Sequence, residues 1–335
     1  PTSCKRAKVV FIPKPGKSDY SSPSSFRPIS LTSFLLKGFE RVILWYLNEN
    51  LLHSNIWHKH VFAYRQGLST ESALHKVISN IEKAKEYGNH VVVVFLDIES
   101  AFNKVPVFSM IRALKKVGTY KALVRLIGNI LSDREILSEM SGESAEIKVG
   151  RGCPQGGILS PVLWNLVMNE AMKTGEKVKA VKPYGYADDL SLAAQGIDMN
   201  TIIDNLQYSL NIYEKWAEEN HLRFSPSKTK AMVFTNKRKY NMKELTIHGK
   251  RIEIVDAFKY LGVTIDNRLT WNQHINRVRN KAMASLQQCR KVVGKDWGVT
   301  PKVTMWLYVG VIRPILLYSS IVWAKAMEDK TKVDR

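Results

Sequence analysis

The sequence predicts an α+β fold in which helices cover an antiparallel sheet. Residues 91–96 form the apolar run Val-Val-Val-Val-Phe-Leu, which is rich in β-branched side chains and typical of a strand buried on both faces. Residues 186–194 place two aspartates between apolar stretches, the pattern of a two-stranded hairpin with an acidic tip. Residues 201–220 carry apolar side chains at helical spacing, so we expect an amphipathic helix that packs beneath the sheet.

The other elements can be placed from local signals along the chain. A loop at 14–25 is rich in Ser, Pro and Gly and is the clearest flexible stretch. Ser160 and Pro161 are a favoured N-cap and first helical residue, so we expect a helix that starts with Ser160 as its cap. Residues 271–293 are again periodic and begin a C-terminal region that we expect to be helical. A chain of 335 residues is long enough for more than one subdomain.

Three carboxylates mark the ends of the predicted strands. Asp97 follows the run 91–96 directly, and Asp188 and Asp189 stand side by side at the hairpin tip. Adjacent aspartates repel each other, a cost that a bound dication would offset. If strand and hairpin are neighbours, Asp97 and Asp188 can share two Mg²⁺ ions, with the backbone carbonyl of Ile98 as a further oxygen ligand. The alternatives are a solvated turn and an aspartate that caps the following helix.

A glycine-rich loop precedes the helix expected from Ser160. Residues 152–157 read Gly-Cys-Pro-Gln-Gly-Gly, and glycines let a backbone approach a ligand closely. Gln155 offers both a hydrogen-bond donor and an acceptor. The pattern fits a ligand-binding loop and, equally, an ordinary loop before a core helix.

In this order, the three motifs resemble motifs A, B and C of the reverse transcriptase palm: the strand ending at Asp97, the Pro154-Gln155-Gly156 loop and the hairpin at 186–189. Other segments match the same family in colinear order along nearly the whole chain. The C-terminal part resembles the thumb of insect-type non-LTR retrotransposons of the jockey kind. The further matching segments are 12–15 and 26–31 (fingers), 62–67, 225–230 (motif D), 258–262 (motif E, the primer grip), and 269–274 and 312–323 (thumb).

The resemblance implies a right-hand polymerase with an antiparallel-sheet palm, fingers and a helical thumb. Fingers would occupy 1–90 with part of 103–150, the palm 91–102 and 150–265, and the thumb 266–335, truncated at the C-terminus. The implied activity is RNA-directed DNA polymerisation, in which a primer 3′-hydroxyl is extended with deoxynucleoside triphosphates by two-metal-ion phosphoryl transfer. The parent retrotransposon protein would also carry an endonuclease and C-terminal regions that are missing from this sequence.

The resemblance also implies roles for the acidic motifs. Asp97 and Asp188 would be the principal Mg²⁺ ligands, with Asp189 beside them and Ile98 offering its carbonyl. Lys228 would lie near the pyrophosphate leaving group and act as a general acid. These residues are therefore the expected catalytic centre.

The nucleotide site implied by the resemblance involves residues from three segments. Phe102 would place its ring under the incoming sugar, where it collides with a 2′-hydroxyl and so selects deoxynucleotides. Lys14 and Arg27 would contact the triphosphate, and Gln155 and Gly156 would line the site. Without the resemblance, a core aromatic residue and solvated surface charges are the simpler interpretations.

The charge of the chain indicates a polyanionic partner. It carries 50 Lys and Arg against 30 Asp and Glu, a net charge of +20. A basic cluster at Arg277, Arg279, Lys281 and 290–291 would contact duplex phosphates from the thumb, unless it is simply a solvated helix face. Together with the resemblance, this charge predicts an RNA template and a DNA primer as partners. Residues 260–262 would hold the end of the primer.

Cysteine and histidine usage gives weaker signals. Three widely separated cysteines, Cys4, Cys153 and Cys289, argue against a disulfide framework or zinc module and favour a reducing compartment. The histidines at 53, 58 and 60 lack the flanking ligands of a metal site, so we expect surface or loop histidines. No apolar run approaches the about 20 residues that cross a bilayer. We expect an intracellular protein without a membrane partner, in the nucleus and cytoplasm.

Two positions depart from the family pattern. Asn103 stands where many relatives have Asp, and Ser319 stands where Gly is expected in the thumb. Neither is a proposed metal ligand. An alternative to the enzyme is a non-catalytic RNA- or hybrid-binding transposon remnant, although the intact carboxylates argue against it.

Overall fold

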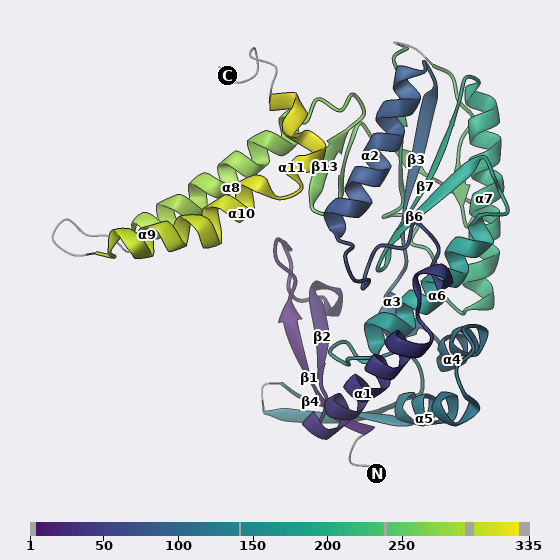
Figure 1. Cartoon of the computed structure of the whole chain (residues 1–335), viewed down its shortest axis with the longest axis vertical. Helices are drawn as coiled ribbons and strands as arrows, with labels where there is room; N and C mark the ends of the chain where they lie inside the picture. Colours follow the sequence, from purple (N-terminus) through teal and green to yellow (C-terminus); the bar gives the residue numbers. More distant parts are fainter. Residues whose placement is uncertain (1–4, 141, 238–239, 292–297, 328–335) are drawn as a thin grey trace.

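The computed structural model describes residues 5–140, 142–237, 240–291 and 298–327. A helix-covered sheet forms the main body, and a helical arm extends from one side of it (Figure 1). Cys4, residues 292–297 and the last eight residues lie outside the described part, so the expectations for Cys4 and for the end of the 271–293 helix stay untested there. The α+β fold class predicted from the sequence is confirmed.

The central sheet has five strands in the order β11-β8-β3-β7-β6, and all pairs are antiparallel except β11 with β8. Strand β3 lies in the middle, and its residues from His90 to Leu96 are all buried, as the apolar run predicted. The predicted hairpin is formed by β6 and β7 and pairs with β3 through β7. The strands are β3 (His90–Asp97), β6 (Val181–Tyr186), β7 (Asp189–Gly196), β8 (Lys230–Phe234) and β11 (Glu253–Ile254).

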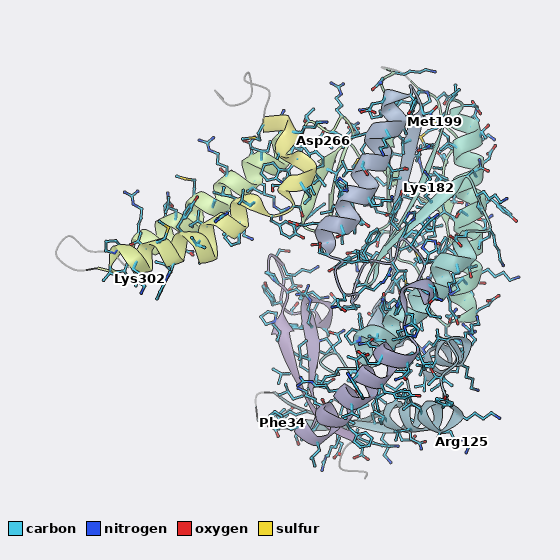
Figure 2. The ribbon with its side chains drawn as sticks, in the orientation of Figure 1. Phe34, Arg125, Lys182, Met199, Asp266 and Lys302 are labelled. Atoms are coloured by element: carbon cyan, nitrogen blue, oxygen red, sulfur yellow. The ribbon has the colours of Figure 1, made fainter. Side chains whose placement is uncertain are left out.

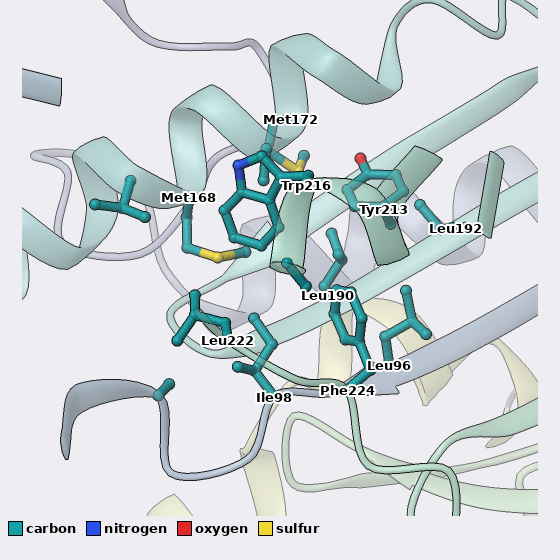
Figure 3. Packing of buried hydrophobic residues seen from close by; sticks show 14 of the residues in the cluster. Leu96, Ile98, Met168, Met172, Leu190, Leu192, Tyr213, Trp216, Leu222 and Phe224 are labelled. Carbon is teal, nitrogen blue, oxygen red and sulfur yellow. The ribbon is translucent and has the colours of Figure 1, made fainter. Parts of the chain in front are cut away.

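The two faces of this sheet are covered by different elements because side chains alternate along β3. Val92, Val94 and Leu96 join a cluster with helices α6 (Ser160–Gly175) and α7 (Met199–Glu219). Figure 3 shows Tyr213 and Trp216 of α7 packed with residues of β7 in this cluster. Helix α7 is the amphipathic helix predicted at 201–220.

The opposite face of the sheet forms a second cluster. Val91, Val93 and Phe95 pack with helix α2 (Thr70–Glu86) and with the hairpin of β12 (Ala257–Tyr260) and β13 (Val263–Asp266). Val322 and Trp323 of the short helix α11 (Ser320–Trp323) complete it. The base of the arm is therefore part of the same core as the central strand.

A separate four-stranded sheet carries the N-terminal strands, in the order β2-β1-β4-β5. The predicted loop at 14–25 joins the antiparallel pair β1 and β2. Helix α1 follows β2, and α4 and α5 precede β4. The bounds are β1 (Arg6–Pro13), β2 (Phe26–Leu31), α1 (Phe34–Asn50), α3 (Ala101–Lys104), α4 (Val107–Lys116), α5 (Lys121–Leu131), β4 (Arg134–Met140) and β5 (Glu143–Val149).

The arm consists of α8 running outward and of α9, a π-helical turn and α10 running back, as Figure 1 shows. In Figure 2, Asp266 marks its base and Lys302 its far end. No single described helix is long and apolar enough for a membrane span; only the bent pair 301–317 and 320–327, counted together, reaches that length and composition. The arm elements are α8 (Asn272–Arg290), α9 (Pro301–Leu307), η4 (Tyr308–Ile312) and α10 (Arg313–Leu317); the short remaining ones are η2 (Pro23–Ser25), η3 (Ser54–Ile56), β9 (Thr246–Ile247), β10 (Lys250–Arg251) and η5 (Ala324–Met327).

One local expectation is incomplete and another is wrong. Of the histidines expected at the surface or in a loop, His53 is exposed, whereas His58 and His60 lie in a loop but are buried, at 5% and 6% exposure. The His60 carbonyl and the Phe62 N–H bond to Gly185 of the edge strand β6, and the His58 N–H donates to Asn169 of α6 at 2.7 Å. Helix α6 contains Ser160, yet the Ser160 hydroxyl does not cap it and instead donates to the Pro154 carbonyl at 2.8 Å. The backbone N–H groups of Ile158 and Leu159, immediately before α6, donate instead to Glu40 of another helix.

Candidate active site

The three predicted carboxylates meet at one end of the central sheet. Asp97 is the last residue of β3 and stands opposite Asp189, the first residue of β7, in the antiparallel register. Such partners have Cα atoms about 4.5–5.5 Å apart. Asp188 occupies the tight turn just before Asp189, after Ala187, whose φ is +54°. The Trp164 indole N–H donates to the Ala187 carbonyl at 3.0 Å and so supports this turn from α6.

The cluster of like charges is costly without a cation. Burial in the cleft, followed by the charges of Asp188 and Asp97, raises the pKa of Asp189 to about 7. Burial and the neighbouring Asp97 also raise the pKa of Asp188. Both residues are exposed to solvent although neighbouring atoms crowd them, so water screens much of this repulsion. A cation placed among the three carboxylates would relieve the rest.

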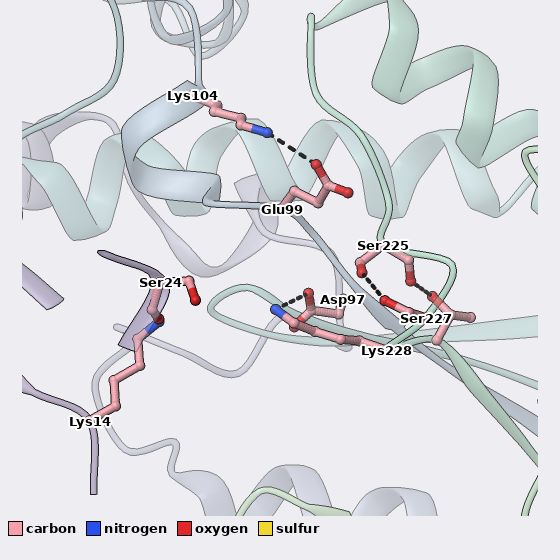
Figure 4. Close-up of polar contacts among 9 residues, drawn as sticks. Lys14, Ser24, Asp97, Glu99, Lys104, Ser225, Ser227 and Lys228 are labelled. Atoms are coloured by element: carbon pink, nitrogen blue, oxygen red, sulfur yellow. Dashed lines mark hydrogen bonds and ion pairs between the residues drawn. The ribbon is translucent and has the colours of Figure 1, made fainter. Parts of the chain in front are cut away.

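Lys228 is the cation that the structure places at this cluster. Its ammonium donates to Asp97 Oδ2 at 3.1 Å (Figure 4). Lys230, two residues further on, points to a different partner and pairs with Glu253 at 2.6 Å. Of these two lysines, Lys228 is the one at the carboxylates.

The donor set suits a hard cation that keeps much of its water. The described residues contain no preformed group of three or more His, Cys, Asp or Glu ligands around one point. Mg²⁺, however, is usually held by one or two carboxylates, with water and substrate phosphates completing the octahedron. In the described chain no backbone hydrogen bond ends on the Ile98 carbonyl, whereas the adjacent Asp97 carbonyl accepts from Ser225 N at 2.8 Å. Asp97, Asp188, Asp189 and Ile98 thus fit a magnesium site that substrate completes.

A cavity of about 450 Å³ opens beside the carboxylates. Asp97 and Asp189 line one side of it, and Lys228 lines another. The remaining wall comes from β12, including Lys259 and Tyr260. Four segments that are separate in sequence, at 95–97, 189–190, 227–230 and 258–260, and that match motifs A, C, D and E, therefore surround one space.

The glycine-rich loop is locked against β2. Ser30 N donates to the Gln155 carbonyl at 2.7 Å. Gly156 has a φ of +118°, and a Cβ there would lie 2.6 Å from the Ser30 carbonyl oxygen, so no side chain fits. The Gln155 amide donates to Asn103 Oδ1 at 3.4 Å, which gives the departure from Asp at position 103 a structural partner. Asn supplies the same acceptor oxygen as Asp would.

Glu40 of α1 is a residue that sequence reasoning missed. It is 1% exposed, and its carboxylate accepts from Ile158 N at 2.9 Å and from the neighbouring Leu159 N. Burial raises the pKa of Glu40, while these backbone hydrogen bonds oppose that shift. Glu40 caps the start of α6 in place of Ser160. A glutamate on an amphipathic helix gives no sequence signal for this role, because it resembles any solvated helix residue.

The residues predicted to bind the nucleotide lie near the carboxylates, but they do not all contact one another. Phe102 is half-buried, and its ring lies 5.7 Å from that of Trp164. Lys14 donates to the Ser24 carbonyl at 2.8 Å, as Figure 4 shows. Burial and the nearby charges of Lys228 and Arg27 lower the pKa of Lys14, so these cations share one region. Neither Lys14 nor Arg27 forms an ion pair with the described carboxylates.

Comparison with known proteins identifies the class. Residues 12–265 match the family described as reverse transcriptase (RNA-dependent DNA polymerase). Since this match covers more than half of the chain, the protein belongs to the reverse transcriptase family.

The particular relatives are retrotransposon proteins of insects. The chain is 31% identical, over 97% of its length, to the probable RNA-directed DNA polymerase from transposon BS of Drosophila melanogaster. It is 28% identical, again over 97%, to the RNA-directed DNA polymerase from mobile element jockey of the same species. It spans 36% of the length of each relative. The resemblance to reverse transcriptases of insect non-LTR retrotransposons is confirmed.

A solved structure supports the fold. Apo telomerase from Candida tropicalis, truncated from its C-terminal domain, aligns with a TM-score of 0.55 and 12% identity. The alignment covers 79% of this chain and 54% of that one. At such low identity the likeness concerns the fold alone, and it agrees with a polymerase fold.

Proposed function

We propose that this chain is the polymerase region of a retrotransposon protein and extends a DNA primer on an RNA template. The observation that carries the proposal is the register of Asp97 opposite Asp189, with Asp188 adjacent, inside the segment that matches the family. Carboxylates at neighbouring strand ends of a rigid buried sheet are suited to hold metal ions once substrate and water supply the remaining ligands.

The chain's own residues would bind and orient the reactants. Asp97, Asp188 and Asp189, with the Ile98 carbonyl, would hold two Mg²⁺ ions. When bound, the ions supply charge neutralisation for the attacking 3′-hydroxyl and the departing pyrophosphate. Lys228, whose ammonium already lies 3.1 Å from Asp97 Oδ2, would donate a proton to the pyrophosphate.

Residues from the fingers side would bind the incoming nucleotide. Lys14 and Arg27 would bind the triphosphate of a deoxynucleotide, Lys14 as a point charge and Arg27 with a planar fork. The Gln155-Gly156 segment, fixed by Ser30, would line the nucleotide site. Phe102, held against Trp164, would lie under the sugar and exclude a 2′-hydroxyl.

Primer extension on a poly-ribonucleotide template tests this proposal. The unaltered chain should incorporate deoxynucleotides in Mg²⁺, and Asp188→Asn should lower the rate on the order of 10³-fold or more, because charge at the reacting phosphate is left uncompensated. Asp204→Asn is the matched control, since Asp204 is a surface residue that pairs with Lys243 away from the carboxylates. Equal inactivity of the unaltered chain and Asp188→Asn, with tight hybrid binding by both, would favour the non-catalytic binder instead.

A further inference from the structure

The arm joins the body through two short connections. The first follows β13, where the Asp266 carboxylate accepts from the backbone N–H of Thr270 at 2.9 Å and of Trp271 at 2.7 Å. The second is Tyr318-Ser319, between α10 and α11. Trp271 and Ser319 both have left-handed backbones, with φ of +63° and +54°. The backbone thus leaves the helical conformation at each connection.

Tyr318 links the second connection to the β12–β13 turn. Its hydroxyl lies 2.9 Å from the Leu261 carbonyl oxygen and 3.1 Å from Thr70 Oγ1. A phenol has one hydrogen, and a carbonyl can only accept, so Tyr318 donates to Leu261 and accepts from the Thr70 hydroxyl. A Cβ at Gly262 would lie 3.0 Å from Tyr318 Cε1, so the ring packs directly on this turn.

The turn that Tyr318 contacts has an unfavourable backbone. Leu261 and Gly262 are the two residues between β12 and β13, and both have positive φ, +45° and +85°. This is the conformation of a type I′ hairpin turn, which Asn-Gly or Gly-Gly adopts easily and a branched Leu does not. Such a conformation persists only where surrounding contacts determine it. The hydrogen bond from Tyr318 to the Leu261 carbonyl is one such contact.

Tyr318 is itself held from both sides. The next residue, Ser319, donates its N–H to Glu71 Oε1 at 2.9 Å, and the Trp323 indole N–H donates to the Tyr318 carbonyl at 3.1 Å. Strand β12, which leads into the turn, continues the contacts towards the site: the Tyr260 hydroxyl lies 3.3 Å from Ser191 Oγ on β7. Ser191 is two residues from Asp189.

We propose that Tyr318 is a positioning residue that holds the Leu261-Gly262 turn in register with the carboxylates and ties it to the arm. This inference rests on the proposed function and on the primer-holding role that the family resemblance implies for residues 260–262. The phenol acts on the primer through the turn, and touches no reacting atom itself. Through Tyr318, the turn and the base of the arm would keep a fixed position relative to each other.

Single-turnover nucleotide incorporation by Tyr318→Phe tests whether the phenol positions the primer end. The variant keeps the ring on Gly262 and loses the hydrogen bond. We expect the rate constant from a preformed primer–template complex to fall about tenfold, because the primer end is misplaced, with an unchanged reaction amplitude. Thr70→Val, which removes the hydroxyl that donates to the phenol, should give a smaller decrease. Tyr87→Phe is the control, since Tyr87 is 83% exposed.

Hydrogen exchange of the apoprotein tests the structural part without any activity. Amides in peptides covering 257–266 should exchange faster in Tyr318→Phe than in Tyr87→Phe. Three results for Tyr318→Phe would each overturn the inference, because the turn would then not depend on the phenol. These are unchanged hydrogen exchange in 257–266, an unchanged single-turnover rate constant, and a lower reaction amplitude with the unaltered rate constant. No incorporation by the unaltered chain, combined with faster exchange in Tyr318→Phe, would overturn the proposed function and the primer role, and leave only the structural link.

Discussion

The central sheet and the arm differ in how many of their side chains are buried. Every residue of β3 from His90 to Leu96 is buried, whereas α9 and α10 contain no buried residue and α8 only His274 and Ala282. Large apolar side chains of the arm stand in solvent, including Trp306 at 62% exposure and Met305 at 59%. The sheet is therefore specified by burial, and the arm by the few contacts at its base.

This difference bears on where each kind of residue can act. The carboxylates stand at the end of a strand that cannot shift without disturbing both clusters of the core, so their geometry is fixed by packing. Along the described part of the arm beyond its base, only Ala282 of α8 and Ile312 of η4 are buried, so packing constrains it much less. Its position depends on Asp266, Tyr318 and Trp323, which belong to the body as much as to the arm.

The largest effect that separates the two regions is on stability. Leu192→Ala, at a fully buried position of β7, should lower the free energy of unfolding by about 3 kcal/mol, since a cavity remains. Trp306→Ala on the arm should change it by less than about 0.5 kcal/mol. Urea denaturation of both variants measures this. Equal losses would show that the arm contributes a core of its own and would end the distinction.

A pH titration of stability sharpens the comparison at the edge of the sheet. Burial lowers the pKa of His60 to about 4, below the value of 6.5 that it has when unfolded. The unfolded chain therefore binds more protons between these values, so stability falls as pH decreases through this window. His60 should account for a loss of about 2 kcal/mol between pH 7 and pH 5.

Two variants test whether His60 causes this pH dependence. His60→Gln should flatten the dependence measured by urea denaturation between pH 5 and 7, while His75→Gln, at an exposed position of α2, should preserve it. If His60→Gln keeps the full dependence, His60 is not its source. His58, whose pKa is also lowered by burial, is then the next candidate.

The smallest expected effect concerns the connection to the arm. Ser319 is fully buried with a left-handed backbone, and its hydroxyl has no hydrogen-bond partner among the described residues, so Gly should relieve both costs. We expect Ser319→Gly to exceed Ser319→Ala in stability by about 0.5–1 kcal/mol, seen as a higher Tm. A more stable Ala variant would mean that the backbone conformation costs nothing, and that the departure from the expected Gly is neutral.

Several parts of the molecule follow from local patterns in the sequence. The apolar run 91–96 predicts β3 because a strand buried on both faces needs apolar residues at every position. The helical spacing of apolar residues in 201–220 predicts α7, and the acidic hairpin pattern predicts the turn at Asp188. The order of these motifs was enough to recognise the family. Each of these signals lies within one element, where residue spacing and backbone geometry are directly related.

The tertiary structure decided the contacts between elements. Glu40 reaches a helix start 118 residues away, Tyr318 a turn 57 residues away, and Lys228 a carboxylate 131 residues away. The burial of His60 depends likewise on its hydrogen bonds to β6, and that of His58 on its contact with Asn169 of α6. The sequence by itself determined which side chains could hold a metal or a nucleotide, because composition and period encode residue type and local shape. Only the fold decided which of them meet, because that depends on how separate elements pack, and no single segment contains that information.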